Sequence, residues 1–167
     1  MSIMQSGVVE VKLTRGLVTI IDAEDLELVT QFKWYATRGK NTNYAVRTPW
    51  IPEERRYQNV SLHRFLLNAP DGVHVDHING DGLCNRRENI RLCTPTENRW
   101  NTQKRKGCRS EFLGVTHRPL RNKTWMAKLI VDKKHYSRSF ATEIEAALYY
   151  DELVKEHHGE FAKLNFP

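Results

Sequence analysis

Apolar and polar residues alternate along the first part of the chain, which is the pattern of strands with one buried face. The alternation runs through residues 9–13 and resumes at 17–21, with Gly16 between the two runs, so we predict a short hairpin. Over residues 23–32 apolar side chains recur every third position, which predicts a short amphipathic helix. Asp22 precedes that helix and is expected to cap it.

The next part of the chain changes from loop-like to apolar sequence. Residues 39–59 are rich in glycine, asparagine, proline and charge, and we expect mostly exposed loop there, with one strand over 44–47. Apolar residues return over 60–67, a segment that also carries His63. A small α+β region is therefore expected to end near residue 59.

The central segment has the pattern of two strands followed by a helix. Residues 73–77 and 89–93 are predicted to be strands, and the run Asn-Gly-Asp-Gly at 79–82 forces a turn because these residues tolerate positive φ. Residues 94–97 read Thr-Pro-Thr-Glu, which combines a capping threonine, a proline at the first helical position and a capping-box glutamate. A helix is therefore predicted to start at residue 95.

Three alternating stretches and one helical stretch end the chain, and they predict a three-stranded antiparallel sheet packed on a helix. The stretches are 112–118, 124–132 and 135–140. Thr142 and Glu145 form a capping box and Gly159 a stop, so the helix is expected over 143–158. Every second residue of the middle strand should face the helix, namely Trp125, Ala127, Leu129 and Val131. The opposite, outward face is expected to carry polar and basic residues, namely Thr116, Arg118, Lys128, Lys134, Tyr136 and Arg138.

Composition places the chain among ordinary soluble proteins. With 167 residues, 40% hydrophobic and 28% charged, it has room for one domain or two small ones. It has neither an apolar run long enough to span a membrane nor a signal-peptide pattern, so we expect a cytoplasmic protein that makes no membrane contact. Its 3 cysteines form no C-x-x-C pair, so neither a disulfide framework nor structural zinc is expected.

The positive charge of the chain is concentrated in one block. Residues 94–140 carry 12 Lys and Arg against 3 Asp and Glu, which is +9 in a chain whose net charge is +6. Aromatic residues are interleaved with these cations, as expected of a surface that binds a polyanion. The alternative is a solvated basic face.

Four polar residues of the central segment suit phosphodiester hydrolysis. Asp76 and Asn98 offer a carboxylate and an amide oxygen to a hard divalent cation, with room left for phosphate and water. His77, with an ordinary pKa near 6.5, suits a general base, and Asn89 could accept its other ring N–H. Asn101 competes with Asn98 for the metal role. The alternative interpretation is a turn-rich hairpin in which these side chains only satisfy backbone groups.

At these positions the segment resembles the His-Asn-His (HNH) homing endonucleases of the ββα-metal superfamily. The resemblance implies that His77 is the general base, that Asn89 is the central structural asparagine, and that Asp76 and Asn98 bind Mg²⁺ or Mn²⁺. It also implies double-stranded DNA as substrate, 5′-phosphate and 3′-hydroxyl ends, and a common occurrence in phage and bacterial genomes. Asn85 and His63 match further positions of the family, the latter without an assigned role.

Residues 111–167 look like the apetala-two / ethylene-response-factor DNA-binding domain. The resemblance runs from LGVTHRP through TWMAKL, HYSRSF and ATEIEAALYYDE to HGEFAKLNFP. It implies that the outward sheet face enters the major groove of DNA. The expected DNA-binding residues are Thr116, Arg118, Lys128, Lys134, Tyr136 and Arg138.

The predicted fold is therefore α+β: a ββα-metal (HNH) nuclease core followed by a three-stranded antiparallel sheet packed on one helix. The expected divisions are 1–59, 60–104 for the nuclease, a basic linker at 105–110 and 111–167 for DNA binding. We predict a metal-dependent, sequence-tolerant but site-specific DNA endonuclease of the homing type, acting as a monomer or homodimer. The alternative is a non-catalytic, sequence-specific DNA-binding regulator, and a metal-activated RNase is a weaker third.

Overall fold

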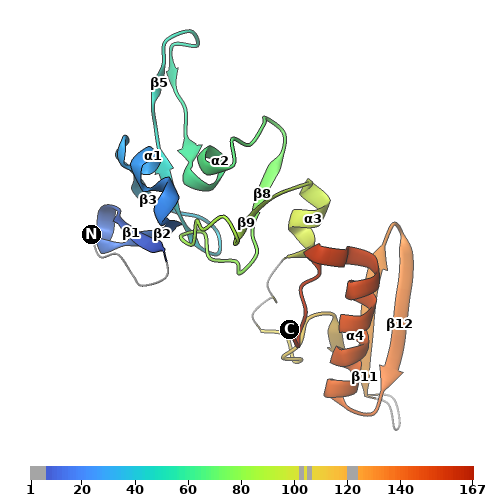
Figure 1. The fold of residues 1–167 in the computed structure, drawn as a ribbon. Helices are drawn as coiled ribbons and strands as arrows, with labels where there is room; N and C mark the ends of the chain where they lie inside the picture. Colours follow the sequence, from blue (N-terminus) through green and yellow to red (C-terminus); the bar gives the residue numbers. More distant parts are fainter. Residues whose placement is uncertain (1–6, 102–103, 105–106, 120–123) are drawn as a thin grey trace. The chain divides into compact units, whose positions relative to one another are not determined.

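A computed structural model describes residues 7–101, 104, 107–119 and 124–167, and its contacts divide the chain into two units (Figure 1). The first unit is Met1–Pro95 and the second is Thr96–Pro167. The division therefore falls inside the segment 60–104 that the sequence assigns to the nuclease. Two residues of the expected linker, 105 and 106, lie outside the described residues.

The first unit opens with the predicted hairpin. β1 (Val8–Lys12) pairs antiparallel with β2 (Val18–Asp22). The helix that follows is shorter than predicted, because α1 covers only Leu26–Thr30 after a 3-10 turn at Ala23–Asp25. The indole N–H of Trp34 donates to the carbonyl of Val29 at 2.9 Å and so closes the last turn of this helix. The Asp22 side chain does not cap it.

A second sheet of the first unit is built from β3 (Tyr35–Arg38), β4 (Asn43–Arg47) and β7 (Val60–Ser61), in the order β3-β4-β7. Where the sequence predicted mostly loop, β5 (Trp50–Ile51) and β6 (Arg56–Tyr57) pair as a small separate hairpin. The short helix α2 (Leu62–Leu66) follows β7 directly.

The two strands and helix predicted for the central segment are present. β8 (His74–His77) pairs antiparallel with β9 (Ile90–Cys93), and α3 (Pro95–Trp100) begins at the predicted residue. The register sets Asp76 opposite Arg91 and His77 opposite Ile90.

One hydrophobic core holds the first unit together and joins its early and late segments. Its buried members come from β1, β2, α1, β4, α2 and β9, together with Trp34: Val9, Ile21, Val29, Trp34, Ala45, Leu62, Leu66 and Ile90. Full burial of such a side chain contributes roughly 1.5–3 kcal/mol. Because Ile90 belongs to this core, strand β9 of the central segment rests on residues before position 60.

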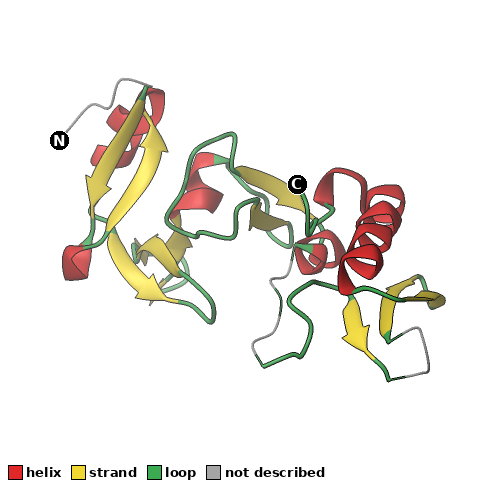
Figure 2. Ribbon diagram, turned by 90° about the horizontal axis from the view of Figure 1, so that it is seen from below, coloured by secondary structure: helices red, strands yellow, loops and turns green. Residues whose placement is uncertain are grey.

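The second unit has the predicted layered arrangement of sheet and helix (Figure 2). Its antiparallel sheet has the order β10 (Val115–His117), β11 (Trp125–Val131), β12 (Lys134–Phe140), and α4 (Glu143–His158) packs on it. The capping box is confirmed: the Thr142 hydroxyl accepts from the Glu145 N–H at 3.2 Å and the Glu145 carboxylate accepts from the Thr142 N–H at 3.0 Å.

The register of β11 and β12 corrects the predicted faces of the sheet. A two-residue turn at Asp132 and Lys133, with φ of 48° and 65°, pairs Val131 with Lys134. An even-numbered residue therefore faces an odd-numbered one, and the side chains of paired residues share a face. Lys134, Tyr136 and Arg138 consequently lie on the helix side of the sheet, and the prediction that they face outward was wrong. The outward face carries Thr116, Met126, Lys128, Ile130, His135, Ser137 and Ser139.

Packing of the helix on the sheet depends on small residues. Ala127, Ala146 and Ala147 are fully buried between the two layers. Gly114 has φ of 68°, and a Cβ at this position would lie 1.9 Å from the ring of Tyr150. The backbone before β10 thus lies directly against a tyrosine of α4. No helix among the described residues is both long and apolar enough to cross a membrane.

Candidate active site

Asp76 and His77 end strand β8, and each is only 6% exposed. The Asp76 carboxylate accepts through Oδ2 from Arg91 on the opposite strand, from Nη2 at 2.9 Å and from Nε at 3.1 Å. This ion pair is itself largely shielded from water. It fixes the orientation of the Asp76 carboxylate. His77 is the next residue in the chain.

The His77 ring is held by an asparagine that is fully buried. Its Nε2 lies 3.2 Å from Oδ1 of Asn85, and Nδ2 of Asn85 donates to the Thr19 hydroxyl at 2.7 Å. The expected partner, Asn89, lies elsewhere: its Oδ1 accepts from the Asn79 N–H at 3.0 Å, and its Nδ2 donates to the Cys84 carbonyl at 2.7 Å. The prediction that Asn89 accepts the ring N–H was wrong, because its amide is used to hold the turn between β8 and β9.

Burial controls the charge of His77. It lowers the pKa of His77 from the ordinary 6.5, and the hydrogen bond to Asn85 and the charges of Asp76 and Asp81 oppose that shift only in part. The imidazole is therefore neutral at pH 7, which is the state that a general base needs.

A second histidine lies against the first. The rings of His63, on α2, and His77 meet edge to face with centroids 4.8 Å apart, and Tyr44 contacts both rings. Burial, with a smaller contribution from His77, lowers the pKa of His63 to about 3. His63 is therefore neutral at pH 7, and its buried Nδ1 has no hydrogen-bond partner. His63 thus packs an uncharged ring against the side of the His77 ring.

The loop between β8 and β9 is attached to strand β2. The Ile20 N–H donates to the Leu83 carbonyl at 2.9 Å, and the Ile20 carbonyl accepts from the Asn85 N–H at 2.7 Å.

Two aspartates that come shortly after Ile20 in the chain bind the arginines of the loop between β8 and β9. Asp22 accepts from Arg86 Nε at 3.1 Å and Arg87 N–H at 2.7 Å, and the buried Asp25 accepts from Arg87 at 2.6 and 3.0 Å.

These contacts give roles to residues that the sequence did not single out for the site. Asp22 was expected to cap a helix, and Thr19 and Asp25 were not considered as site residues. Each of the three meets its partner more than 60 positions away in the chain. No local sequence pattern could have found them, because each belongs to a polar pair whose two members are far apart in the chain.

The predicted metal ligands lie in different units. Asp76 is in the first unit, and Asn98 and its competitor Asn101 follow Pro95 in the second. Within the described part of the chain, no group of three His, Cys, Asp or Glu side chains could hold a metal ion. The oxygen donors of Asp76 and Asn98 suit a hard divalent cation. Their pairing as metal ligands stays a prediction.

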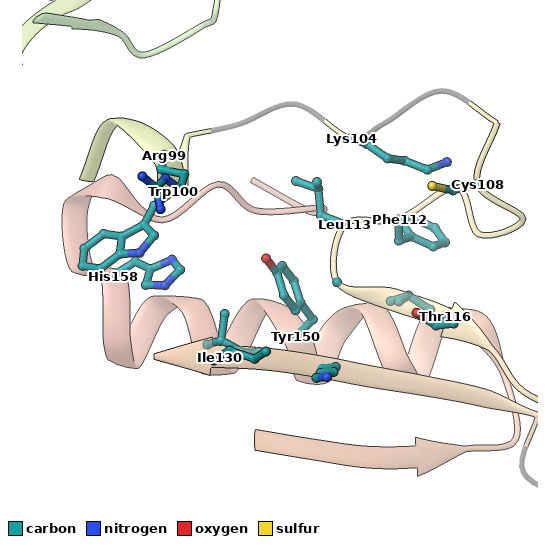
Figure 3. A pocket seen from close by; sticks show the side chains of 14 residues that line it. Arg99, Trp100, Lys104, Cys108, Phe112, Leu113, Thr116, Ile130, Tyr150 and His158 are labelled. Carbon is teal, nitrogen blue, oxygen red and sulfur yellow. The ribbon is translucent and has the colours of Figure 1, made fainter. Parts of the chain in front are cut away.

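In the second unit, α3 packs on the end of α4. Trp100 stacks on His158 with ring centroids 4.1 Å apart and an angle of 6° between the rings (Figure 3). The stack borders a pocket of about 670 Å³, into which the Tyr150 hydroxyl is turned. Most of helix α3 thereby belongs to the second unit, which explains why the chain divides after Pro95.

Comparison with known proteins identifies the central segment. Residues 68–100 match the family profile described as HNH endonuclease. A relative from Acanthamoeba polyphaga mimivirus, named an uncharacterized HNH endonuclease, is 28% identical over 158 residues, which cover 90% of this chain and 76% of the relative. Protein 3.8 of Escherichia phage T7 is 29% identical over 94 residues, which cover 56% of this chain and 77% of the relative. No solved structure gives a significant match.

Proposed function

We propose that this chain is a metal-dependent endonuclease of the homing type, a DNA phosphodiester hydrolase, because its residues 68–100 match the family profile described as HNH endonuclease and its mimivirus relative carries the same description. It cuts double-stranded DNA at a preferred site, tolerates some variation in that site, and leaves 5′-phosphate and 3′-hydroxyl ends. The observation that carries the proposal is the buried, neutral His77, held by Asn85 and adjacent to Asp76. The phage relative supports an origin in phage or bacteria, within the host cytoplasm.

His77 acts as the general base that removes a proton from the attacking water. Asp76 and Asn98 are the residues that would hold Mg²⁺ or Mn²⁺, an ion that stabilises negative charge on the phosphate and on the leaving 3′ oxygen. Asn89 acts indirectly, because its two hydrogen bonds hold the turn that carries Asn79 and Cys84.

We propose that the second unit binds DNA through the outward face of its sheet, as in the apetala-two / ethylene-response-factor domains that its sequence resembles. Thr116 and Lys128 are exposed on that face, and Arg118 follows directly after β10. Lys134 and Arg138 are exposed as well and stay candidates for phosphate contacts from the helix side. Tyr136 is a weaker candidate, because its ring packs 4.5 Å from that of His157.

The proposed surface predicts a selective loss of DNA affinity. Lys128→Ala should weaken DNA binding about 3- to 10-fold at moderate salt and reduce the slope of log K against log salt by about 1, because one phosphate contact is lost. Lys155→Ala is the matched control, since Lys155 is an exposed lysine of α4. Fluorescence anisotropy with a labelled duplex measures both variants. Equal affinities of the two variants would contradict the assignment of this face.

Cleavage itself is tested with supercoiled plasmid and genomic DNA in Mg²⁺, Mn²⁺ or EDTA. We expect cleavage in either metal and none in EDTA. Relaxed circles would indicate that a monomer nicks one strand, since each chain has one proposed nuclease centre. Linear DNA would indicate a pair of chains. Binding without cleavage on a broad panel of sequences would instead favour the non-catalytic DNA-binding regulator.

A further inference from the structure

The donors and acceptors along a buried chain of hydrogen bonds determine which ring nitrogen of His77 carries the proton. The chain starts at Thr19 on β2, which is fully buried and whose hydroxyl lies 2.8 Å from the Leu83 carbonyl. A carbonyl oxygen only accepts, so Thr19 gives its single hydroxyl proton to Leu83. At its second contact, 2.7 Å from the Asn85 amide, the Thr19 oxygen can therefore only accept.

This requirement orients the Asn85 amide. Its NH₂ group must face Thr19, and the same nitrogen lies 3.4 Å from the Gly82 carbonyl, another group that only accepts. The amide oxygen is thereby turned toward His77. In the flipped amide, two oxygens would meet at Thr19 with no proton between them. The Gly82 carbonyl would lose its donor as well.

The amide oxygen of Asn85 then decides which nitrogen of His77 carries the proton. Because this oxygen cannot donate, Nε2 at 3.2 Å must carry the hydrogen. A neutral imidazole has one N–H, so the lone pair lies on Nδ1.

We infer that Thr19 is a positioning residue for the nuclease: through Asn85 it holds the neutral His77 ring in the Nε2–H tautomer, which leaves the lone pair of the proposed base on Nδ1. The inference rests on the proposed function in taking His77 as the general base. Thr19 lies outside residues 68–100, so the nuclease segment obtains the tautomer of its base from strand β2.

The tautomer can be read without activity. Full-length protein labelled with ¹⁵N-histidine, in EDTA and without DNA, gives separate resonances for the two ring nitrogens of His77. We expect a protonated Nε2 and an unprotonated Nδ1 in the wild type and in Thr19→Ser, which keeps the hydroxyl. Thr19→Val has nearly the same shape without the hydroxyl, and its two resonances should move toward the average of the two tautomers. A wild-type Nδ1–H tautomer, or a Thr19→Val spectrum like that of the wild type, would overturn the inference.

Kinetics provide the second readout. Thr19→Val should lower kcat about 10- to 100-fold with little change in KM, because a base in the wrong tautomer fails after substrate has bound. Thr19→Ser should stay within about 2-fold of the wild type. The two proposals fail separately: a wild type that shows the Nε2–H tautomer but cuts no DNA refutes the nuclease function alone. Active protein whose Thr19→Val variant is unimpaired refutes the role of Thr19 alone.

Discussion

Replacing His77 with alanine is expected to lower the rate of DNA cleavage by about 10²- to 10⁴-fold, the usual contribution of general base catalysis. The ring supplies the buried, neutral nitrogen base that the proposed reaction uses, and Asp76 is held by Arg91 and cannot replace it. DNA binding should persist, because the cations of the second unit are unchanged. Plasmid cleavage in Mg²⁺ and a gel-shift titration of the same preparation measure the two effects.

His74→Ala is the matched control for this variant. His74 lies on the same strand, three residues earlier, and is exposed. We expect His74→Ala to cut DNA at close to the wild-type rate. Cleavage by His77→Ala at the wild-type rate would remove His77 from the mechanism. Loss of both cleavage and the far-ultraviolet dichroism of the native protein would show instead that the variant is unfolded, and His77→Gln would then replace it as the test.

Gly114→Ala is expected to reduce the free energy of unfolding of the second unit by roughly 2–5 kcal/mol. The backbone at Gly114 has positive φ, which costs a residue with a Cβ about 1–2 kcal/mol. The added methyl group would also lie 1.9 Å from the Tyr150 ring, an overlap that forces the helix from the sheet and typically costs about 1–3 kcal/mol. Thermal unfolding followed by circular dichroism measures the change.

Gly107→Ala separates the two causes. Gly107 of the same unit also has positive φ, but no atom lies within 4 Å of an added Cβ, so only the backbone cost of about 1–2 kcal/mol applies. The double variant Gly114→Ala, Tyr150→Leu should recover part of the loss, because the smaller side chain makes room for the methyl group. Equal destabilisation by the two alanine variants would contradict the close approach of Gly114 to α4.

Local signals predicted the elements of the second unit well and its sheet faces badly. Helix α4 has the predicted bounds because Thr142, Glu145 and Gly159 mark both of its ends. The outward placement of Tyr136 and Arg138 was wrong because each strand was given a face separately. The face of β12 depends on which residue of β11 it pairs with, and the turn at Asp132 and Lys133 decides that pairing.

The candidate site shows the same limit. The strand that carries Asp76 and His77 was predicted, because its alternation and the turn that follows it are local features. The partner of His77 was not, because Asn85 is oriented by Thr19, which lies 66 positions earlier in the chain. A satisfied buried amide leaves no local pattern, since its requirement is met only in three dimensions.

The attachment of the β8–β9 loop to β2 determines how the proposed nuclease centre could be transferred to another protein. Residues 68–100 alone would leave Asn85 without Thr19, Arg87 without Asp25, and Ile90 without the core that surrounds it. A chimaera built from that segment would carry the sequence motif but not its scaffold. A cassette that keeps these partners and the proposed metal ligand Asn98 starts at strand β1 and continues through helix α3, so the proposed DNA-binding sheet is best exchanged after Trp100.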